Sequence, residues 1–218
     1  MSRNETENSR AKKDTAENFS GAVAALRCGD VIVYPTETLY GLGADAFNNA
    51  AVERVSHLKG RDSHNPISVL VADREMLHNL VPEVSPVAEK LMAEFWPGPL
   101  TLVLPARRDI PKPLLNAAGG IGVRISSQPL ASRLVAALRR PLTATSANPS
   151  GKQPARTVQQ AKAYFSNEVK VFLDGGRLTS KRGSTVVEIV GEAIKIIREG
   201  EVGASQIRQI IGDDISPR

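Results

Sequence analysis

Apolar residues along this chain fall into short continuous runs that alternate with longer stretches in which they recur every three or four positions. The short runs predict buried strands, and the longer period predicts amphipathic helices. The expected strands are 31–34, 67–71, 100–104, 121–125, 142–145, 169–173, 185–190 and 193–197. The expected helices are 21–26, 50–59, 87–95, 129–138 and 203–211. This order predicts an α/β fold.

The connections between these elements favour a mixed sheet. Only Gly191 and Glu192 separate the last two strands, which predicts a hairpin. Earlier strands and helices alternate, as they do in β-α-β crossovers. We therefore expect a twisted mixed β-sheet with flanking helices, without an internal repeat or an interdomain linker.

Length and composition predict one folded domain between two short tails. The chain has 218 residues, and 41% of them are apolar, which is enough for a sizeable core. Residues 1–18 carry few apolar side chains and are expected to be a disordered tail; 19–212 form the domain and 213–218 a short C-terminal tail. No apolar run approaches the roughly 18 residues that span a bilayer, so a cytoplasmic location is expected.

Charge and metal-ligand content narrow the possible functions. Lys and Arg exceed Asp and Glu by 28 to 23, giving a net charge of +5, which favours phosphate-rich partners but also fits any soluble basic protein. Cys28 is the only cysteine, so an intramolecular disulfide is excluded, and we expect it to be packed or semi-buried. His57, His64 and His78 lack metal-ligand spacing, and we assign no metal site.

Two polar clusters at the ends of expected elements indicate a polyphosphate site. Lys59 ends the expected helix 50–59 and Arg61 follows two residues later, so the pair offers a point charge beside a planar donor fork. Ser146 and Asn148 follow a strand and add uncharged donors. Both clusters also have simpler interpretations, because a lysine near a helix C-terminus interacts with the helix dipole and Ser-Ala-Asn-Pro is typical of a turn.

Other polar residues follow apolar strands, where α/β sheets often place ligand contacts. Arg124 lies near the end of the expected strand 121–125 and Arg198 follows the strand 193–197. An arginine there needs an anionic partner from the protein or from a ligand. The polar segment 35–38 follows another strand, although a plain turn fits it as well.

Gly41 and Gly43 fit the dinucleotide-binding pattern G-x-G-x-x-A, but six residues separate the first glycine from the preceding strand. We expect these glycines to shape a loop. The sequence contains no P-loop motif, so any nucleotide must be held by dispersed side chains.

Several motifs together resemble the YrdC/TsaC family of threonylcarbamoyl-adenylate synthases, in its short bacterial form. The K-x-R and S-x-N motifs occur with other matching pieces in the family's order, over roughly residues 20 to 210. The pieces are 34–43, 59–61, 65–66, 96–101, 123–125, 146–148, 184–187 and 197–198.

The resemblance implies a YrdC-like fold with an open basic cavity. It also implies a nucleotidyltransferase that condenses L-threonine, bicarbonate and ATP, releases pyrophosphate, and serves the threonylcarbamoyladenosine modification of tRNAs that read ANN codons. The expected catalytic residues are Lys59, Arg61, Ser146 and Asn148. The expected ATP contacts are Lys59, Arg61, Asn65, Asn148 and Arg198. The expected threonine contacts are Thr38, Arg124, Ser146 and Ser184.

The same resemblance implies Mg²⁺ bound through the ATP phosphates, separate proteins that transfer the threonylcarbamoyl group to tRNA, and no membrane partner. Three departures from the family pattern, at Asp62, Leu70 and Gly120 to Gly122, bear on substrate affinity. Two other readings stay open: a module that binds double-stranded RNA or tRNA, and an inactive paralogue of the same fold.

Overall fold

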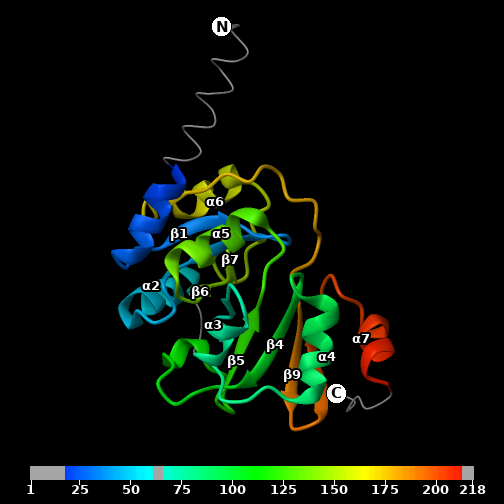
Figure 1. The fold of residues 1–218 in the computed structure, drawn as a ribbon. Helices are drawn as coiled ribbons and strands as arrows, with labels where there is room; N and C mark the ends of the chain where they lie inside the picture. The colour runs from blue at the N-terminus through cyan, green and yellow to red at the C-terminus, as the bar shows by residue number, and fades with distance from the viewer. Residues whose placement is uncertain (1–17, 61–65, 213–218) are drawn as a thin grey trace, which may run out of the picture.

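The computed structural model describes residues 18–60 and 66–212, and its strands form two mixed sheets (Figure 1). The four-stranded sheet has the order β7-β2-β1-β8, and the six-stranded sheet has the order β10-β9-β4-β5-β3-β6. The strands are β1 (Ile32–Pro35), β2 (Tyr40–Gly43), β3 (Val69–Leu70), β4 (Leu100–Pro105), β5 (Gly120–Arg124), β6 (Leu142–Thr143), β7 (Thr145–Ser146), β8 (Val171–Phe172), β9 (Thr185–Val190) and β10 (Ala193–Arg198). The expected α/β class is confirmed, with the strands divided between two sheets.

Helices flank both sheets, and their ends follow from local sequence. A helix over 18–27 comes first, followed by α2 (Asn49–Lys59), α3 (Arg74–His78), α4 (Pro86–Phe95), the 3₁₀ turn η1 (Lys112–Leu114), α5 (Pro129–Leu138), α6 (Val158–Phe165) and α7 (Ala204–Ile211). The helix α2 begins at the cap Asn48, whose side chain accepts a hydrogen bond from the Ala51 amide, and ends at Gly60 in the left-handed conformation.

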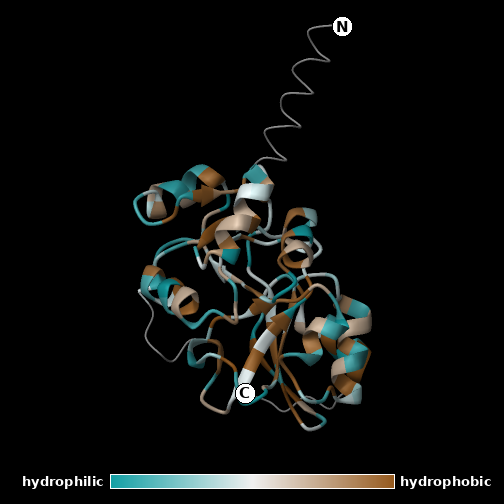
Figure 2. Ribbon diagram, turned by 60° about the vertical axis from the view of Figure 1, so that its left-hand side comes forward, coloured by the Kyte–Doolittle hydropathy of each residue, from teal (hydrophilic) through white to brown (hydrophobic). Residues whose placement is uncertain are grey.

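Both faces of the four-stranded sheet are buried. Val31 and Val33 pack into the main core, whereas the alternate residues Ile32 and Tyr34 pack into a second core with α5 and the helix at 18–27. In Figure 2, helices with one hydrophobic and one hydrophilic face surround largely hydrophobic strands. On the six-stranded sheet, α4 and α7 lie side by side (Figure 1).

The apolar run at 142–145 is two short strands instead of the single expected one. Leu142 and Thr143 pair with β3 in the six-stranded sheet, and Thr145 pairs with Leu42 in the four-stranded sheet. The chain thus crosses between the sheets at Ala144. Hydrogen bonds reinforce this crossing: the buried Tyr34 hydroxyl donates to the Thr143 carbonyl oxygen at 2.8 Å, and the Thr143 hydroxyl donates to that of Leu42 at 3.0 Å.

The expectation of a loop at Gly41 and Gly43 is wrong, because both residues belong to β2, which pairs antiparallel with β1. The Tyr34 ring of β1 lies over them. A Cβ at Gly43 would stand 2.7 Å from that ring, and one at Gly41 would stand 3.3 Å from it. The glycines therefore make room for a buried aromatic side chain within the strand pair.

Two of the helices, α3 and α6, were not expected from the sequence. Among the described residues, no helix is long and apolar enough to cross a membrane. The expected tail segments 1–17 and 213–218 lie outside the described residues. Cys28 is exposed and not packed or semi-buried, because the chain turns at Gly29 directly after the first helix.

Candidate active site

A cavity of about 830 Å³ is lined by residues of both sheets. The four-stranded sheet contributes Tyr40 and Gly41 of β2 and Thr145 and Ser146 of β7. The six-stranded sheet contributes residues of β4, β5, β9 and β10. Five residues expected to bind substrates line this cavity: Thr38, Arg124, Ser146, Ser184 and Arg198.

Arg124, at the end of β5, is held by a carboxylate of the protein. Its Nη1 donates to Glu37 Oε1, and the hydroxyl of Ser126 donates to the other oxygen of the same carboxylate. The side chains of Arg124 and Glu37 are only 6% and 15% exposed, so this ion pair is largely shielded from solvent. The anionic partner that the sequence demands for Arg124 is therefore Glu37, which we did not predict as a site residue.

Arg198 lies beside Arg124 and reaches Ser184 on the neighbouring strand end. Its Nη2 and Nε both donate to the Ser184 carbonyl oxygen, at 2.8 and 3.2 Å. Burial, and secondly the charge of Arg124, lower the pKa of Arg198. The Ser184 hydroxyl lies 2.8 Å from that of Thr101. Two guanidinium groups thus belong to one cavity, an arrangement suited to an anionic ligand.

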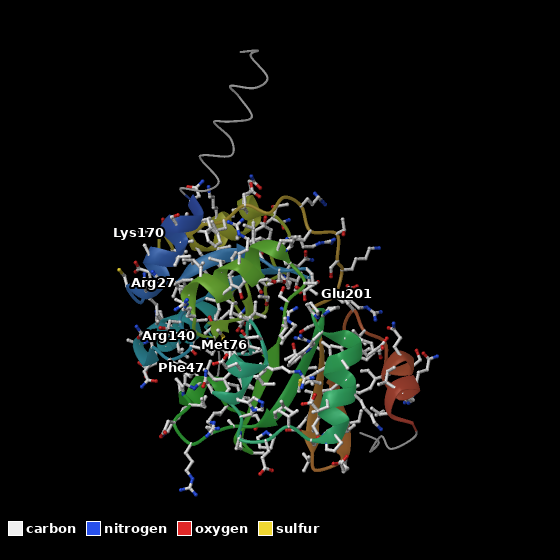
Figure 3. All side chains as sticks on the ribbon, viewed as in Figure 1. Arg27, Phe47, Met76, Arg140, Lys170 and Glu201 are labelled. Atoms are coloured by element: carbon white, nitrogen blue, oxygen red, sulfur yellow. The ribbon has the colours of Figure 1, made fainter. Side chains whose placement is uncertain are left out.

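The side chains of Tyr40 and Glu201 hold the segment between β8 and β9, which carries Ser184. Near its start, the Tyr40 hydroxyl donates to the Gly176 carbonyl oxygen at 2.8 Å and accepts from the Gly175 amide at 2.9 Å. Burial raises the pKa of Tyr40 to about 12. Near its end, Glu201, labelled in Figure 3, accepts hydrogen bonds from the Ser180 hydroxyl and the Arg182 amide. The first of these lowers the pKa of Glu201 most.

Lys59 joins the two predicted phosphate-binding motifs directly. Its ammonium nitrogen lies 2.7 Å from the Ser146 carbonyl oxygen, 2.6 Å from that of Asn148 and 3.1 Å from Asn148 Oδ1. The Ser150 amide in turn donates to the Lys59 carbonyl oxygen at 2.7 Å. The end of α2 and the loop after β7 are therefore fixed to each other by the residues that the sequence grouped together.

The two motifs are not equally accessible. Lys59 is 2% exposed and Asn148 6%, and of this group only Ser146 lines the cavity. The Asn148 amide nitrogen donates to the carbonyl oxygens of Pro149 and Lys152, so the side chain holds its own loop. Arg61 and Asn65, like Asp62, lie outside the described residues, although the following Pro66 lines the cavity.

Thr38 reaches the cavity through a compact turn between β1 and β2. The Thr36 hydroxyl lies 3.0 Å from that of Thr38 and donates to the Leu39 carbonyl oxygen at 2.7 Å. Both threonines are buried. The polar turn and the ligand contact, which the sequence left as alternatives, therefore describe the same residues.

Among the described residues that line the cavity, positive and negative charges are equal in number: Arg124 and Arg198 are balanced by Glu188 and Glu199. Glu188 accepts a hydrogen bond from the amide of Asn116 at 2.7 Å. Within 18–60 and 66–212, no cluster of His, Cys, Asp and Glu is suited to hold a metal ion. The open basic character expected of the cavity stays a prediction.

Glu37 and Thr101 are the principal site residues that sequence reasoning missed. Both stand inside matched motifs, Tyr34 to Gly43 and Trp96 to Thr101. The available signal was an acidic side chain in a buried polar segment and a threonine in an apolar strand. Neither residue type reveals its partner, because both contacts join residues more than 80 positions apart.

Comparison with known proteins gives consistent matches over most of the chain. The Sua5/YciO/YrdC family model, described as "Telomere recombination", matches residues 24–200. Similar curated proteins include the threonylcarbamoyl-AMP synthases of Pyrococcus abyssi, 34% identical over 92% of this chain, and Thiobacillus denitrificans, 41% identical over 80%. The chain spans 60% of the first relative and 95% of the second.

Solved structures extend the likeness to the fold. The structure of Pyrococcus abyssi Sua5 complexed with L-threonine has a TM-score of 0.86 and 34% identity, and the match covers 91% of this chain and 59% of that one. Escherichia coli YciO has a TM-score of 0.79 and 28% identity, with 87% of this chain and 92% of that one covered.

Proposed function

We propose, on the premise that this chain belongs to the Sua5/YciO/YrdC family, that it is a threonylcarbamoyl-AMP synthase. It would condense L-threonine, bicarbonate and ATP and release pyrophosphate, for the threonylcarbamoyladenosine modification of tRNAs that read ANN codons. The observation that carries the proposal is the gathering of Thr38, Arg124, Ser146, Ser184 and Arg198 around one cavity of about 830 Å³. Relatives named for this activity support it.

The threonine end of the cavity is assigned to Thr38, Arg124, Ser146 and Ser184. In the described structure Arg124 donates to Glu37 through one terminal nitrogen, Nη1, and a guanidinium offers five donors. The rest of the fork suits the substrate carboxylate. Short hydroxyl side chains at Thr38 and Ser184 are suited to hydrogen bonds with the substrate's amine and hydroxyl groups.

The ATP end is assigned to Lys59, Arg61, Asn65, Asn148 and Arg198. Lys59 has two roles in this proposal, because it holds the Ser146 to Asn148 loop and its ammonium is a point charge for phosphate oxygens. Substrate binding would replace some of its contacts with Ser146 and Asn148 by contacts with phosphate. Arg198 lines the same cavity as the residues of the threonine end and is suited to the α-phosphate.

The chemistry requires positioning more than a protein nucleophile. The threonine amine attacks the carbon of bicarbonate, and loss of water gives N-carboxythreonine. A carboxylate oxygen of this intermediate then forms a bond to the α-phosphorus of ATP, while the bond to the pyrophosphate oxygen breaks. Orientation of the substrates and neutralisation of phosphate charge supply the acceleration. Lys59, Arg61, Ser146 and Asn148 are the residues proposed to act on the reacting phosphate.

Mg²⁺ is proposed to enter with ATP. The cavity offers hydroxyl groups, guanidinium groups and two separated glutamates, which suits an ion held mainly by phosphate oxygens and water. When bound, it would neutralise phosphate charge. Downstream, tRNA and separate transfer proteins are the proposed partners, in the cytoplasm.

Pyrophosphate release from purified protein tests this function. The mixture contains ATP, Mg²⁺, bicarbonate and L-threonine, and each substrate is omitted in turn. We expect release only when all three substrates are present, and we expect Lys59→Ala and Arg61→Ala each to lower the rate by about tenfold or more. Folded protein without threonine-dependent release, but with salt-sensitive binding of double-stranded RNA, would favour the RNA-binding module instead.

A further inference from the structure

A second cavity, of about 390 Å³, lies outside the site described above. One face of α6 lines it with Gln160 and Tyr164, and the segment before α6 contributes Gln153 and Arg156. Arg177 comes from the segment that follows β8, which runs beside α6 in Figure 1. The Leu178 amide donates to the Arg156 carbonyl oxygen at 2.9 Å and joins the two segments.

This cavity has an uncompensated positive charge. Arg156 and Arg177 both line it, and none of its lining residues is acidic. Among the described residues neither arginine forms an ion pair. The Nε of Arg156 is buried and has no hydrogen-bond partner in the described structure. A buried cationic donor without an acceptor is costly, so a bound acceptor would stabilise this arrangement.

The other lining residues specify the kind of acceptor. Gln160 Oε1 accepts from the Arg156 amide at 2.8 Å, so the Gln160 amide group is the donor that remains for a ligand. The half-buried Tyr164 adds an aromatic ring suited to stacking on a base. Two guanidinium groups match phosphate oxygens, and the volume exceeds what a phosphate ion alone would fill.

We propose that this second cavity binds a nucleotide phosphate, free or within an RNA strand, through Arg156 and Arg177. Its wall adjoins the first cavity, because Pro154 lines both. The neighbouring Ala155 accepts from the Tyr40 amide at 3.0 Å and donates to the Ala147 carbonyl oxygen at 3.3 Å. These contacts connect the segment before α6 to the Ser146 to Asn148 loop. This proposal does not depend on the proposed reaction.

Arginine Nε–H resonances of the full-length ¹⁵N-labelled protein test it directly. The probes are inorganic phosphate, AMP and a short RNA strand without a terminal phosphate, each titrated at constant ionic strength against a chloride blank. We expect the Arg156 Nε–H resonance to shift with at least one probe, because that nitrogen acquires an acceptor. A shift with phosphate and AMP identifies a free nucleotide as the source, and a shift with RNA alone identifies a strand.

Three variants locate the effect. Arg177→Gln should lower the affinity for the probe by about fivefold or more, since one of two guanidinium contacts is lost. Arg208→Gln on α7 is the matched control and should bind as the unmodified protein does. Arg198→Ala alters only the first cavity and should leave the Arg156 shift intact. An unmoved Arg156 resonance with all probes, unchanged affinity in Arg177→Gln, or loss of the shift in Arg198→Ala would overturn the proposal, whatever the synthase assay gives.

Discussion

The ammonium nitrogen of Lys59 lies 2.6 Å from the backbone carbonyl oxygen of Asn148. This contact joins the last residue of α2 to the loop after β7, across 89 positions of sequence. Because Lys59 is 2% exposed, the contact is shielded from water and fixes the loop firmly. The lysine of the K-x-R motif therefore determines where the S-x-N motif stands.

Lys59→Ala should lower both stability and activity. The substitution removes the Lys59 donor from the carbonyl oxygens of Ser146 and Asn148, which predicts a loss of about 1–3 kcal/mol in the free energy of unfolding. It also removes a phosphate ligand, so pyrophosphate release should fall by about tenfold or more. Denaturant unfolding and the synthase assay measure the two effects. Lys90→Ala, at an exposed position of α4, is the control.

An unchanged rate in folded Lys59→Ala protein would contradict the site assignment. A lost rate together with unchanged unfolding would instead contradict the structural role of the lysine. The two measurements therefore separate the two roles.

Glu37→Gln should raise the KM for threonine. The amide keeps the shape of the carboxylate but removes the charge that holds Arg124, so the guanidinium loses the orientation in which it receives a substrate carboxylate. We expect an increase in KM of about threefold or more, and a stability loss of about 1–3 kcal/mol. Glu94→Gln on α4 is the matched control, because Glu94 is exposed. A lower KM would mean that Glu37 competes with the substrate and does not position Arg124.

The local elements were predictable because their signals lie within short stretches of sequence. Both α5 and β9 have the expected bounds, since a proline opens the helix and the strand is a short run of mostly apolar, β-branched residues. The division of 142–145 between two sheets was not predictable. Its apolar run carries no mark at Ala144, and the pairing partners Leu42, Val69 and Leu70 lie far away in sequence.

The glycine pair of β2 illustrates the same limit. Gly41 and Gly43 look like loop formers by local propensity, but the ring of Tyr34 on the paired strand requires their lack of side chains. The omission of α6 is of another kind. Val158, Ala161 and Phe165 have helical spacing and are buried, and Thr157 caps the helix, so the signal was present in the sequence.

For the site, the motifs in the sequence identified candidate residues, and the fold showed which of them lie together. Five of the expected substrate contacts line one cavity, and Lys59, Ser146 and Asn148 contact one another. The sequence did not reveal that Lys59 and Asn148 are buried. It also did not pair Glu37 with Arg124, because a strand-end arginine is equally suited to a ligand.

Tyr40→Phe should destabilise the protein, and the difference should shrink at high pH. The hydroxyl joins β2 to Gly175 and Gly176, so its loss at neutral pH should cost about 1–3 kcal/mol. The folded pKa, raised to about 12, exceeds the unfolded value near 10. The stabilising contribution of the phenol is therefore complete below pH 10 and is lost as the pH rises towards 12.

Denaturant unfolding at pH 8 and pH 11 measures this difference. Tyr164→Phe is the control, because the Tyr164 hydroxyl forms no hydrogen bond within the described residues. An equal difference between the unmodified protein and Tyr40→Phe at both pH values would contradict the raised pKa.

Arg198→Lys should make ATP use sensitive to alkaline pH. Burial and the neighbouring Arg124 lower the pKa of the cation at this position, and arginine tolerates this because its ordinary pKa lies far above the working pH. Lysine ordinarily titrates near 10.4, and the same two causes favour its neutral form. The variant's activity should therefore be highest below the lowered pKa and fall as the pH rises through it. We expect kcat/KM for ATP in Arg198→Lys to decline at a pH below the ordinary titration of lysine near 10.4, relative to the unmodified protein and to Arg208→Lys, and parallel profiles would show that position 198 carries no charge required by ATP.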